Sequence, residues 1–161
     1  MSAELSRSAR RVQAWLAGRG YDSHVQELPD STRTAAEAAR AVGCEVAQIA
    51  KSLVFRARGS GTALLVIASG TNRVSEARLA ALAGEPIERA DADFVREQTG
   101  FAIGGVPPVA HARPLRIWID RDLLRYECIW AAAGTPRAVF PFESARLAEL
   151  TGGEIADLAE T

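Results

Sequence analysis

The pattern of apolar residues predicts a helix near the start of the chain, because apolar positions recur there on one helical face. That face consists of Leu5, Ala9, Val12 and Leu16, and we expect the helix over residues 3–18. Further helices are predicted where a capping side chain precedes an amphipathic run and a glycine follows it. They extend from the capping box Thr34–Glu37 to Gly43, from Ser75 to Gly84, from Asp91 or Asp93 to Gly100, and from Ser144 to about residue 151, with one more turn over 45–50.

Strands are predicted where β-branched and apolar residues cluster or alternate between turn residues. These segments are 23–28, 51–56, 63–68, 115–120, 126–133 and 137–140. Two pairs of them form hairpins, whereas the Gly- and Pro-rich residues 101–111 predict an irregular loop. The order of elements does not fit a Rossmann or TIM-barrel fold. It favours an α+β fold, a single domain over residues 1–161, with a mixed, largely antiparallel sheet surrounded by helices.

Composition and charge narrow the possible partners. The 161 residues are 48% hydrophobic and 24% charged, as in an ordinary globular protein, and the formal net charge is −1. Such a chain lacks the basic field of a duplex-binding protein, so we expect no DNA partner. The basic start has no apolar segment of a signal peptide, and no apolar stretch is long enough to cross a membrane. We therefore expect a cytoplasmic protein without a membrane partner.

Known cofactor and nucleophile motifs are missing from the sequence. Cys44 and Cys128 are too few for a disulfide scaffold, and their apolar neighbours predict core positions. His24 and His111 do not form a zinc-binding pattern. Because no phosphate-binding glycine loop and no serine nucleophile elbow occur either, we predict neither a metal nor an organic cofactor.

One basic residue differs from all the others. The chain has 18 arginines and a single lysine, Lys51, at the start of a predicted strand. A solvated lysine tolerates replacement by arginine, but a site that needs a compact ammonium does not. Lys51 is therefore a candidate functional residue, with an ordinary lysine at a strand end as the alternative.

The segments around Lys51 and in the predicted loop resemble a known family. The run QIAKSLVF at 48–55 and the pattern Gly104-x-x-x-Pro108 are similar to the lysine segment and the glycine–proline loop of the YbaK/prolyl-tRNA synthetase editing-domain family. Further matches, in the same order along the chain, are TAAEA at 34–38, Gly70 with Arg73-Val74, TGF at 99–101 and AAGTP at 132–136. The resemblance covers roughly residues 20–155.

This resemblance implies a free-standing aminoacyl-tRNA deacylase that works without a cofactor. Such a protein hydrolyses, in trans, the ester between a wrong amino acid and the terminal adenosine of a tRNA. Its expected partners are the acceptor end of a mischarged tRNA and, as a further candidate, prolyl-tRNA synthetase. The alternative is a catalytically silent module of the same fold that binds tRNA or the synthetase.

The resemblance also assigns roles to particular residues. Lys51, Gly104 and Gly105 are the catalytic candidates: the lysine binds the terminal phosphate or the ester, and the glycine N–H groups stabilise the oxyanion. The nucleophile is expected to be water, positioned by the vicinal hydroxyl of the tRNA. The residues expected to bind substrate are Val106, Pro107, Pro108, His111, Ala133 and Gly134.

Two of these assignments have open alternatives. His111 either contacts substrate or is a hydrogen-bonded structural histidine, and the hairpin at 131–136 either lines the amino-acid pocket or merely packs. The small residues in these segments predict a small substrate side chain, alanine ahead of cysteine and serine, carried on a proline tRNA.

Overall fold

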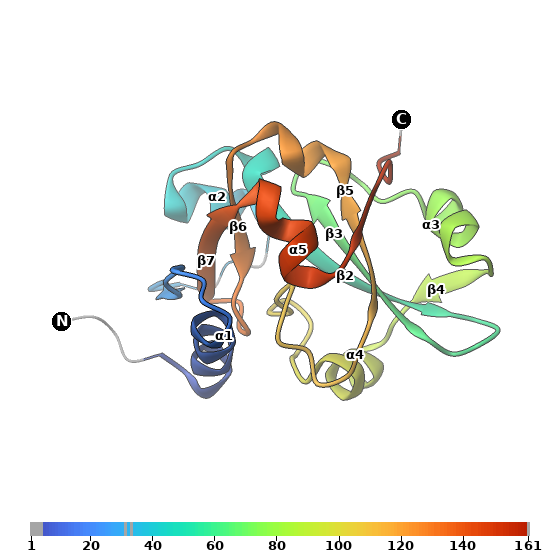
Figure 1. The fold of residues 1–161 in the computed structure, drawn as a ribbon, viewed down its shortest axis with the longest axis horizontal. Helices are drawn as coiled ribbons and strands as arrows, with labels where there is room; N and C mark the ends of the chain where they lie inside the picture. The colour runs from blue at the N-terminus through green and yellow to red at the C-terminus, as the bar shows by residue number, and fades with distance from the viewer. Residues whose placement is uncertain (1–4, 31, 33, 161) are drawn as a thin grey trace.

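The computed structural model describes residues 5–30, 32 and 34–160. Its helices are α1 (Arg7–Gly18), α2 (Ala35–Val42), α3 (Glu76–Ala83), α4 (Ala92–Thr99) and α5 (Leu147–Thr151), with short 3-10 turns η1 (Val46–Gln48), η2 (Arg121–Arg125) and η3 (Ser144–Arg146). The strands are β1 (Gln26–Glu27), β2 (Ile49–Ala57), β3 (Ala63–Ser69), β4 (Ile87–Arg89), β5 (Arg116–Asp120), β6 (Cys128–Ala132), β7 (Ala138–Glu143) and β8 (Glu154–Ala156). Figure 1 shows their arrangement.

All the strands belong to one eight-stranded sheet, in the order β1-β7-β6-β2-β3-β5-β8 with β4 beside β2. The pairs β1–β7, β6–β7, β2–β3 and β2–β4 are antiparallel, whereas β2–β6, β3–β5 and β5–β8 are parallel. The predicted mixed sheet with helices around it is confirmed. The short strands β4 and β8 were not predicted.

The predicted helix caps are largely confirmed. Thr34 and Ser75 accept hydrogen bonds from backbone N–H groups of the first turns of α2 and α3. Asp91, rather than Asp93, caps α4. The predicted start of the first helix at residue 3 lies outside the described residues. The prediction that Ser144 caps the last helix is wrong, because its hydroxyl donates to the Tyr126 carbonyl instead.

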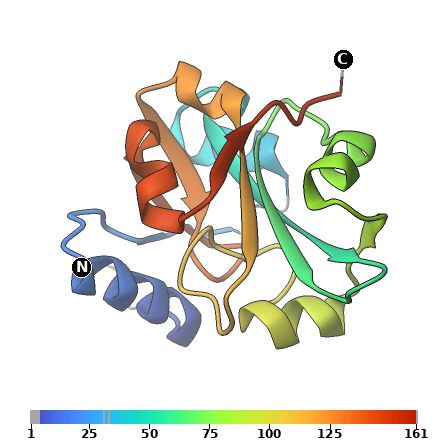
Figure 2. The ribbon, with the colours of Figure 1, turned by 45° about the vertical axis from the view of Figure 1, so that its right-hand side comes forward.

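Side chains on the two faces of the sheet form separate apolar clusters. Alternate residues of β3 point to opposite faces: Leu65 and Ile67 pack with residues of α1, α4 and α5, and Leu64 and Val66 pack with residues of α3. Helices α1 and α4 lie together at one end of the molecule in both ribbon views (Figure 2). Among the described residues, no helix is long and apolar enough to cross a bilayer.

The two cysteines lie outside the main core. Cys128, at the start of β6, is exposed, and Cys44, just after α2, is half-buried. The prediction that both are core residues is therefore wrong. Both cysteines stand at the ends of elements beside exposed glutamates, Glu45 and Glu127. Cys44 packs only against the edge of a small apolar cluster that contains Ala39 and Ile49.

Candidate active site

The sheet opens along one edge of β2, and this opening creates the candidate site. Strand β6 pairs with β2 only at Ile49 and Ala50, and β4 pairs with the same strand only from Phe55 to Ala57. Between these pairings, residues 51–54 have no neighbouring strand on that side; we call this stretch the edge gap. A cavity of about 690 Å³ opens over it. Small-molecule sites commonly have volumes of this order.

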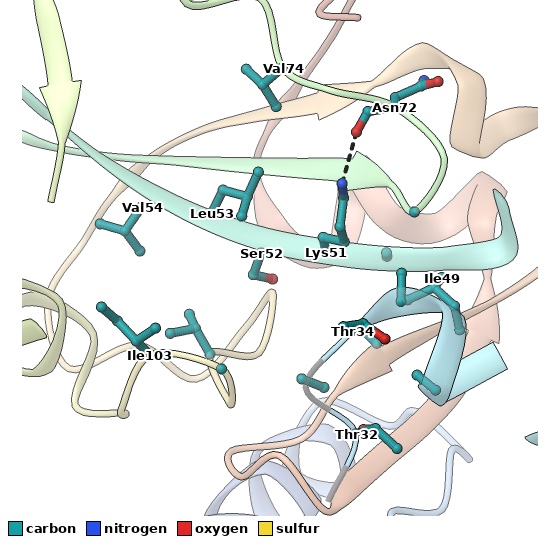
Figure 3. Close-up of a pocket in the computed structure, with 18 of the residues that line it drawn as sticks. Thr32, Thr34, Ile49, Lys51, Ser52, Leu53, Val54, Asn72, Val74 and Ile103 are labelled. Atoms are coloured by element: carbon teal, nitrogen blue, oxygen red, sulfur yellow. Dashed lines mark hydrogen bonds between the residues drawn. The ribbon is translucent and has the colours of Figure 1, made fainter. Parts of the chain in front are cut away.

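The cavity extends over both faces of β2 at the edge gap. Lys51 and Leu53 point to one side of the strand, and Ser52 and Val54 point to the other (Figure 3). Ile103, from the loop after α4, lies on the side of Ser52 and Val54 in the same view. A strand alternates its side chains in this way, so four consecutive residues of β2 contribute to one cavity.

Lys51 is the charged residue at the centre of this arrangement. It is half-buried, and its Nζ donates a hydrogen bond of 2.8 Å to the carbonyl oxygen of Asn72. Burial is the main cause that lowers the pKa of Lys51 below its ordinary value, and the positive charge of Arg73 also lowers it. The negative charge of Asp120 opposes both effects. The ammonium is thus partly desolvated and points into the cavity region.

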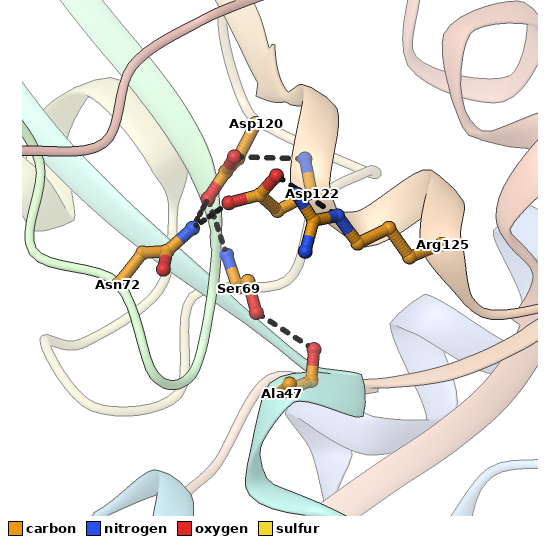
Figure 4. A network of polar contacts seen from close by, with 6 residues as sticks. All are labelled: Ala47, Ser69, Asn72, Asp120, Asp122 and Arg125. Atoms are coloured by element: carbon orange, nitrogen blue, oxygen red, sulfur yellow. Dashed lines mark hydrogen bonds and ion pairs between the residues drawn. The ribbon is translucent and has the colours of Figure 1, made fainter. Parts of the chain in front are cut away.

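A buried carboxylate holds the loop that receives Lys51. Asp120 accepts hydrogen bonds from the Ser69 N–H at 3.0 Å, the Asn72 Nδ2 at 2.8 Å and the Asp122 N–H at 3.0 Å (Figure 4). Asn72 Nδ2 also donates to Asp122 Oδ2 at 2.8 Å. The network fixes the turn after β3, and this turn carries the carbonyl that binds the Lys51 ammonium. Asp120 also caps η2, because its side chain accepts the Asp122 N–H at the start of that turn.

The glycine loop reaches the cavity from the opposite side. Gly104 lines the cavity and has a φ of +93°, a conformation that favours glycine. No described residue accepts a hydrogen bond from its N–H. The N–H of Gly105, in contrast, donates to Ala102 O at 3.1 Å, and its carbonyl accepts from the Gly134 N–H at 2.9 Å. A Cβ on Gly105 would lie 2.8 Å from the Thr135 nitrogen, so the two loops need glycine for their close packing.

The structure brings only part of the expected site together. Lys51, Gly104 and Val106 line the cavity, together with Ala131 and Ala132 of the β6 hairpin. The other residues expected in the site line no part of this cavity: Gly105, Pro107, Pro108, His111, Ala133 and Gly134.

The second group of residues has other contacts. His111 Nε2 is hydrogen-bonded to Pro107 O at 2.7 Å, and it lines a separate, smaller depression with Pro108 and Trp15. Burial lowers the pKa of His111, although the bond to Pro107 raises it in part. Ala133 is fully buried, and its N–H donates to the Ala138 carbonyl in the hairpin. In this geometry these residues support the loops and do not face the cavity.

Sequence reasoning missed most polar residues of the site, among them Ser52 and Asn72. Both line the cavity. Ser52 falls inside the matched run 48–55 and Asn72 between the matched Gly70 and Arg73, but the resemblance assigned neither of them a role. No group of three or more potential metal ligands occurs among the described residues.

The fold is a mixed α/β domain with a cavity at an opened edge of its sheet. Comparison with known proteins identifies the family: the chain belongs to the aminoacyl-tRNA editing domains, whose family model matches residues 29–150. This confirms the resemblance seen in the sequence.

The chain is also similar to solved structures and to a curated relative. A candidate trans-editing enzyme for prolyl tRNA synthetase is 53% identical, with a TM-score of 0.93 over 98% of this chain and 100% of its own. The hypothetical protein APE2540 is 33% identical, with a TM-score of 0.86 over 93% and 99% of the two chains. The uncharacterized protein YwhH of Bacillus subtilis (strain 168) is 28% identical over 148 residues, which are 92% of this chain and 94% of that protein.

Proposed function

We propose that this protein is a cytoplasmic hydrolase that removes wrongly attached amino acids from tRNA in trans. The observation that carries the proposal is the position of the Lys51 ammonium. It lies at the edge gap, in a cavity that the Gly104 loop also lines, within a chain of the aminoacyl-tRNA editing family. The cavity volume of about 690 Å³ is suited to a terminal adenosine with a small amino acid attached.

The proposed reaction is hydrolysis of the ester at the ribose of the terminal adenosine. A water molecule attacks the ester carbonyl carbon, and negative charge develops on the carbonyl oxygen. The Gly104 N–H stabilises this oxygen, and Lys51 binds the terminal phosphate or the ester as a positive charge. The bond from the carbonyl carbon to the ribose oxygen then breaks, and that oxygen takes up the proton released by the water. The vicinal ribose hydroxyl of the tRNA positions the water.

The proposed substrate carries a small amino acid on a proline tRNA. The walls near the glycine loop consist of Gly104, Val106, Ala131 and Ala132, which leave room for a small side chain. We expect alanine to be preferred over cysteine and serine, since pocket volume distinguishes small apolar groups. A related structure is described as a candidate trans-editing enzyme for prolyl tRNA synthetase, which supports a proline tRNA and that synthetase as partners.

A panel of mischarged tRNAs tests this function. The protein at micromolar concentration is incubated with tRNAs that carry different amino acids, and ester loss is compared with spontaneous hydrolysis. We expect accelerated loss for small amino acids. If no ester in the panel is hydrolysed faster than it is spontaneously, the enzyme proposal is refuted, and binding of the same tRNAs would then indicate a silent module.

A further inference from the structure

The backbone of β2 points its hydrogen-bonding groups alternately to its two sides. Ala57 N–H donates to Thr62 O on the β3 side at 2.9 Å, and Arg58 N–H donates to Pro86 O on the β4 side at 2.9 Å. Ala90 N–H donates to Val54 O, also on the β4 side. Even-numbered residues of β2 therefore direct their N–H and C=O groups away from β3.

The same alternation extends through the edge gap. The register of β2 with β3 is uninterrupted from Ala50 to Arg56, so no bulge shifts the pattern. The N–H and C=O of Ser52 and the N–H of Val54 consequently point into the gap between β6 and β4. Among the described residues, no turn or loop forms a backbone hydrogen bond with any of these three groups.

The Ser52 side chain adds a fourth polar group at the same place. Its hydroxyl oxygen is buried and has no hydrogen-bond partner among the described residues. Buried polar groups in folded proteins are almost always hydrogen-bonded, so a cluster of unpaired donors and acceptors needs a ligand or ordered water. The edge gap is thus a place where a ligand can satisfy groups that the fold leaves open.

The length of the gap limits what can bind there. β6 closes it at the Ala50–Ala131 pair. On the other side β4 closes it at the Phe55–Arg89 pair, and the Ala90 N–H still donates to Val54 O at 3.4 Å, so the Val54 N–H lies at the end of the gap beside Ala90. A complete peptide strand would need to displace one of these strands. A single residue fits the gap, because its one donor nitrogen and one acceptor carbonyl can pair with one C=O and one N–H of β2, as in a sheet.

We propose that the edge gap binds the aminoacyl group of the substrate as if it were one residue of an additional strand. The Ser52 carbonyl accepts a hydrogen bond from the α-ammonium, and the Val54 N–H donates to the ester carbonyl oxygen. This assignment rests on the substrate class proposed above. It makes the free α-amino group a recognition element, so an ester whose amine is acylated, as in peptidyl-tRNA, is a poor substrate.

A non-hydrolysable analogue separates binding from turnover. The probe is alanine joined by an amide to 3′-amino-3′-deoxyadenosine, and the matched probe carries an N-acetylated alanine. Both are titrated into protein with ¹⁵N-labelled valine. We expect the first probe to shift the Val54 amide signal and to bind about tenfold more tightly than the acetylated one. The Val66 amide, in β3 on the other side of β2, is the reference signal.

Turnover is measured in parallel with alanyl-tRNA and N-acetylalanyl-tRNA, each corrected for its spontaneous hydrolysis. We expect about tenfold selectivity for the free amine. The selectivity is expected to fall after incorporation of α-hydroxyvaline at position 54, which keeps the side chain and replaces the backbone N–H by an ester oxygen. This inference is wrong, and the proposed function stands, if alanyl-tRNA is hydrolysed but the free amine is preferred neither in binding nor in turnover and the Val54 signal does not move. If the analogue binds as expected without turnover, the inference stands and the hydrolase proposal fails.

Discussion

Replacement of Lys51 by methionine is expected to remove most activity and little stability. The variant keeps an unbranched side chain one atom shorter than lysine and loses the ammonium, which donates to Asn72 O at 2.8 Å. A hydrogen bond from a charged group contributes about 1.5–3 kcal/mol, but solvent screens the half-exposed ammonium and burial lowers its pKa. We therefore expect a net loss below about 1 kcal/mol, or a Tm decrease of about 2–4 °C.

The effect on the rate is expected to be much larger. Loss of one charge-assisted contact in the transition state costs about 2–4 kcal/mol, which corresponds to roughly 30- to 1000-fold in rate. Single-turnover release of alanine from alanyl-tRNA measures this loss, and Lys51→Arg is expected to be impaired as well. Arg58→Met is the matched control, because Arg58 is an exposed cation directly after β2. A Lys51→Met rate within twofold of wild type, or an equal loss in the control, would refute the assignment.

The remaining predictions concern ionisation, packing, metal and specificity. Because Lys51 is the one lysine of the chain, ¹³C-lysine labelling reports its titration alone, and we expect a pKa below the ordinary value of 10.5. The pKa is expected to be lower still in Asp120→Asn, because the negative charge of Asp120 raises it. A higher pKa in the variant would contradict the network. Gly105→Ala is expected to lower the free energy of unfolding, measured in urea, by about 1–3 kcal/mol, because its Cβ would meet Thr135 backbone atoms. Gly18→Ala is the control, because a Cβ at Gly18 has open space around it. Equal stability of the two variants would argue against the close packing of the loops. A chelator is expected to leave the deacylation rate unchanged, and inhibition that added zinc reverses would overturn this. Leucyl-tRNA is expected to react more slowly than alanyl-tRNA, and the opposite order would show that the pocket is not small.

Local signals in the sequence were sufficient for most helices and for the hairpins. Caps such as Thr34 and Asp91 act within four residues of the chain, so they can be recognised without knowledge of the fold. The strands β4 and β8 each contain three residues, too few to show an alternating pattern. They exist because β2 and β5 offer them an edge, and this is a property of the tertiary structure.

The site was predictable only in part for a similar reason. Lys51 and Gly104 were found from residue type and motif, and both line the cavity. Motif order along the chain, however, does not determine which way a loop turns, so His111 was expected beside them and instead lines another depression. The edge gap depends on where β6 leaves β2 and where β4 joins it, and no local pattern encodes these two positions.

A trans-editing hydrolase of the kind proposed here removes a small, wrongly attached amino acid and leaves the correct one in place. The most direct test of this function is a parallel measurement with alanyl-tRNA and prolyl-tRNA prepared from the same proline tRNA, at micromolar protein. We expect the alanyl ester to be lost well above its spontaneous rate, while the prolyl ester decays at its spontaneous rate. An alanyl ester that remains at its spontaneous rate, or equal acceleration of both esters, would contradict the proposed function.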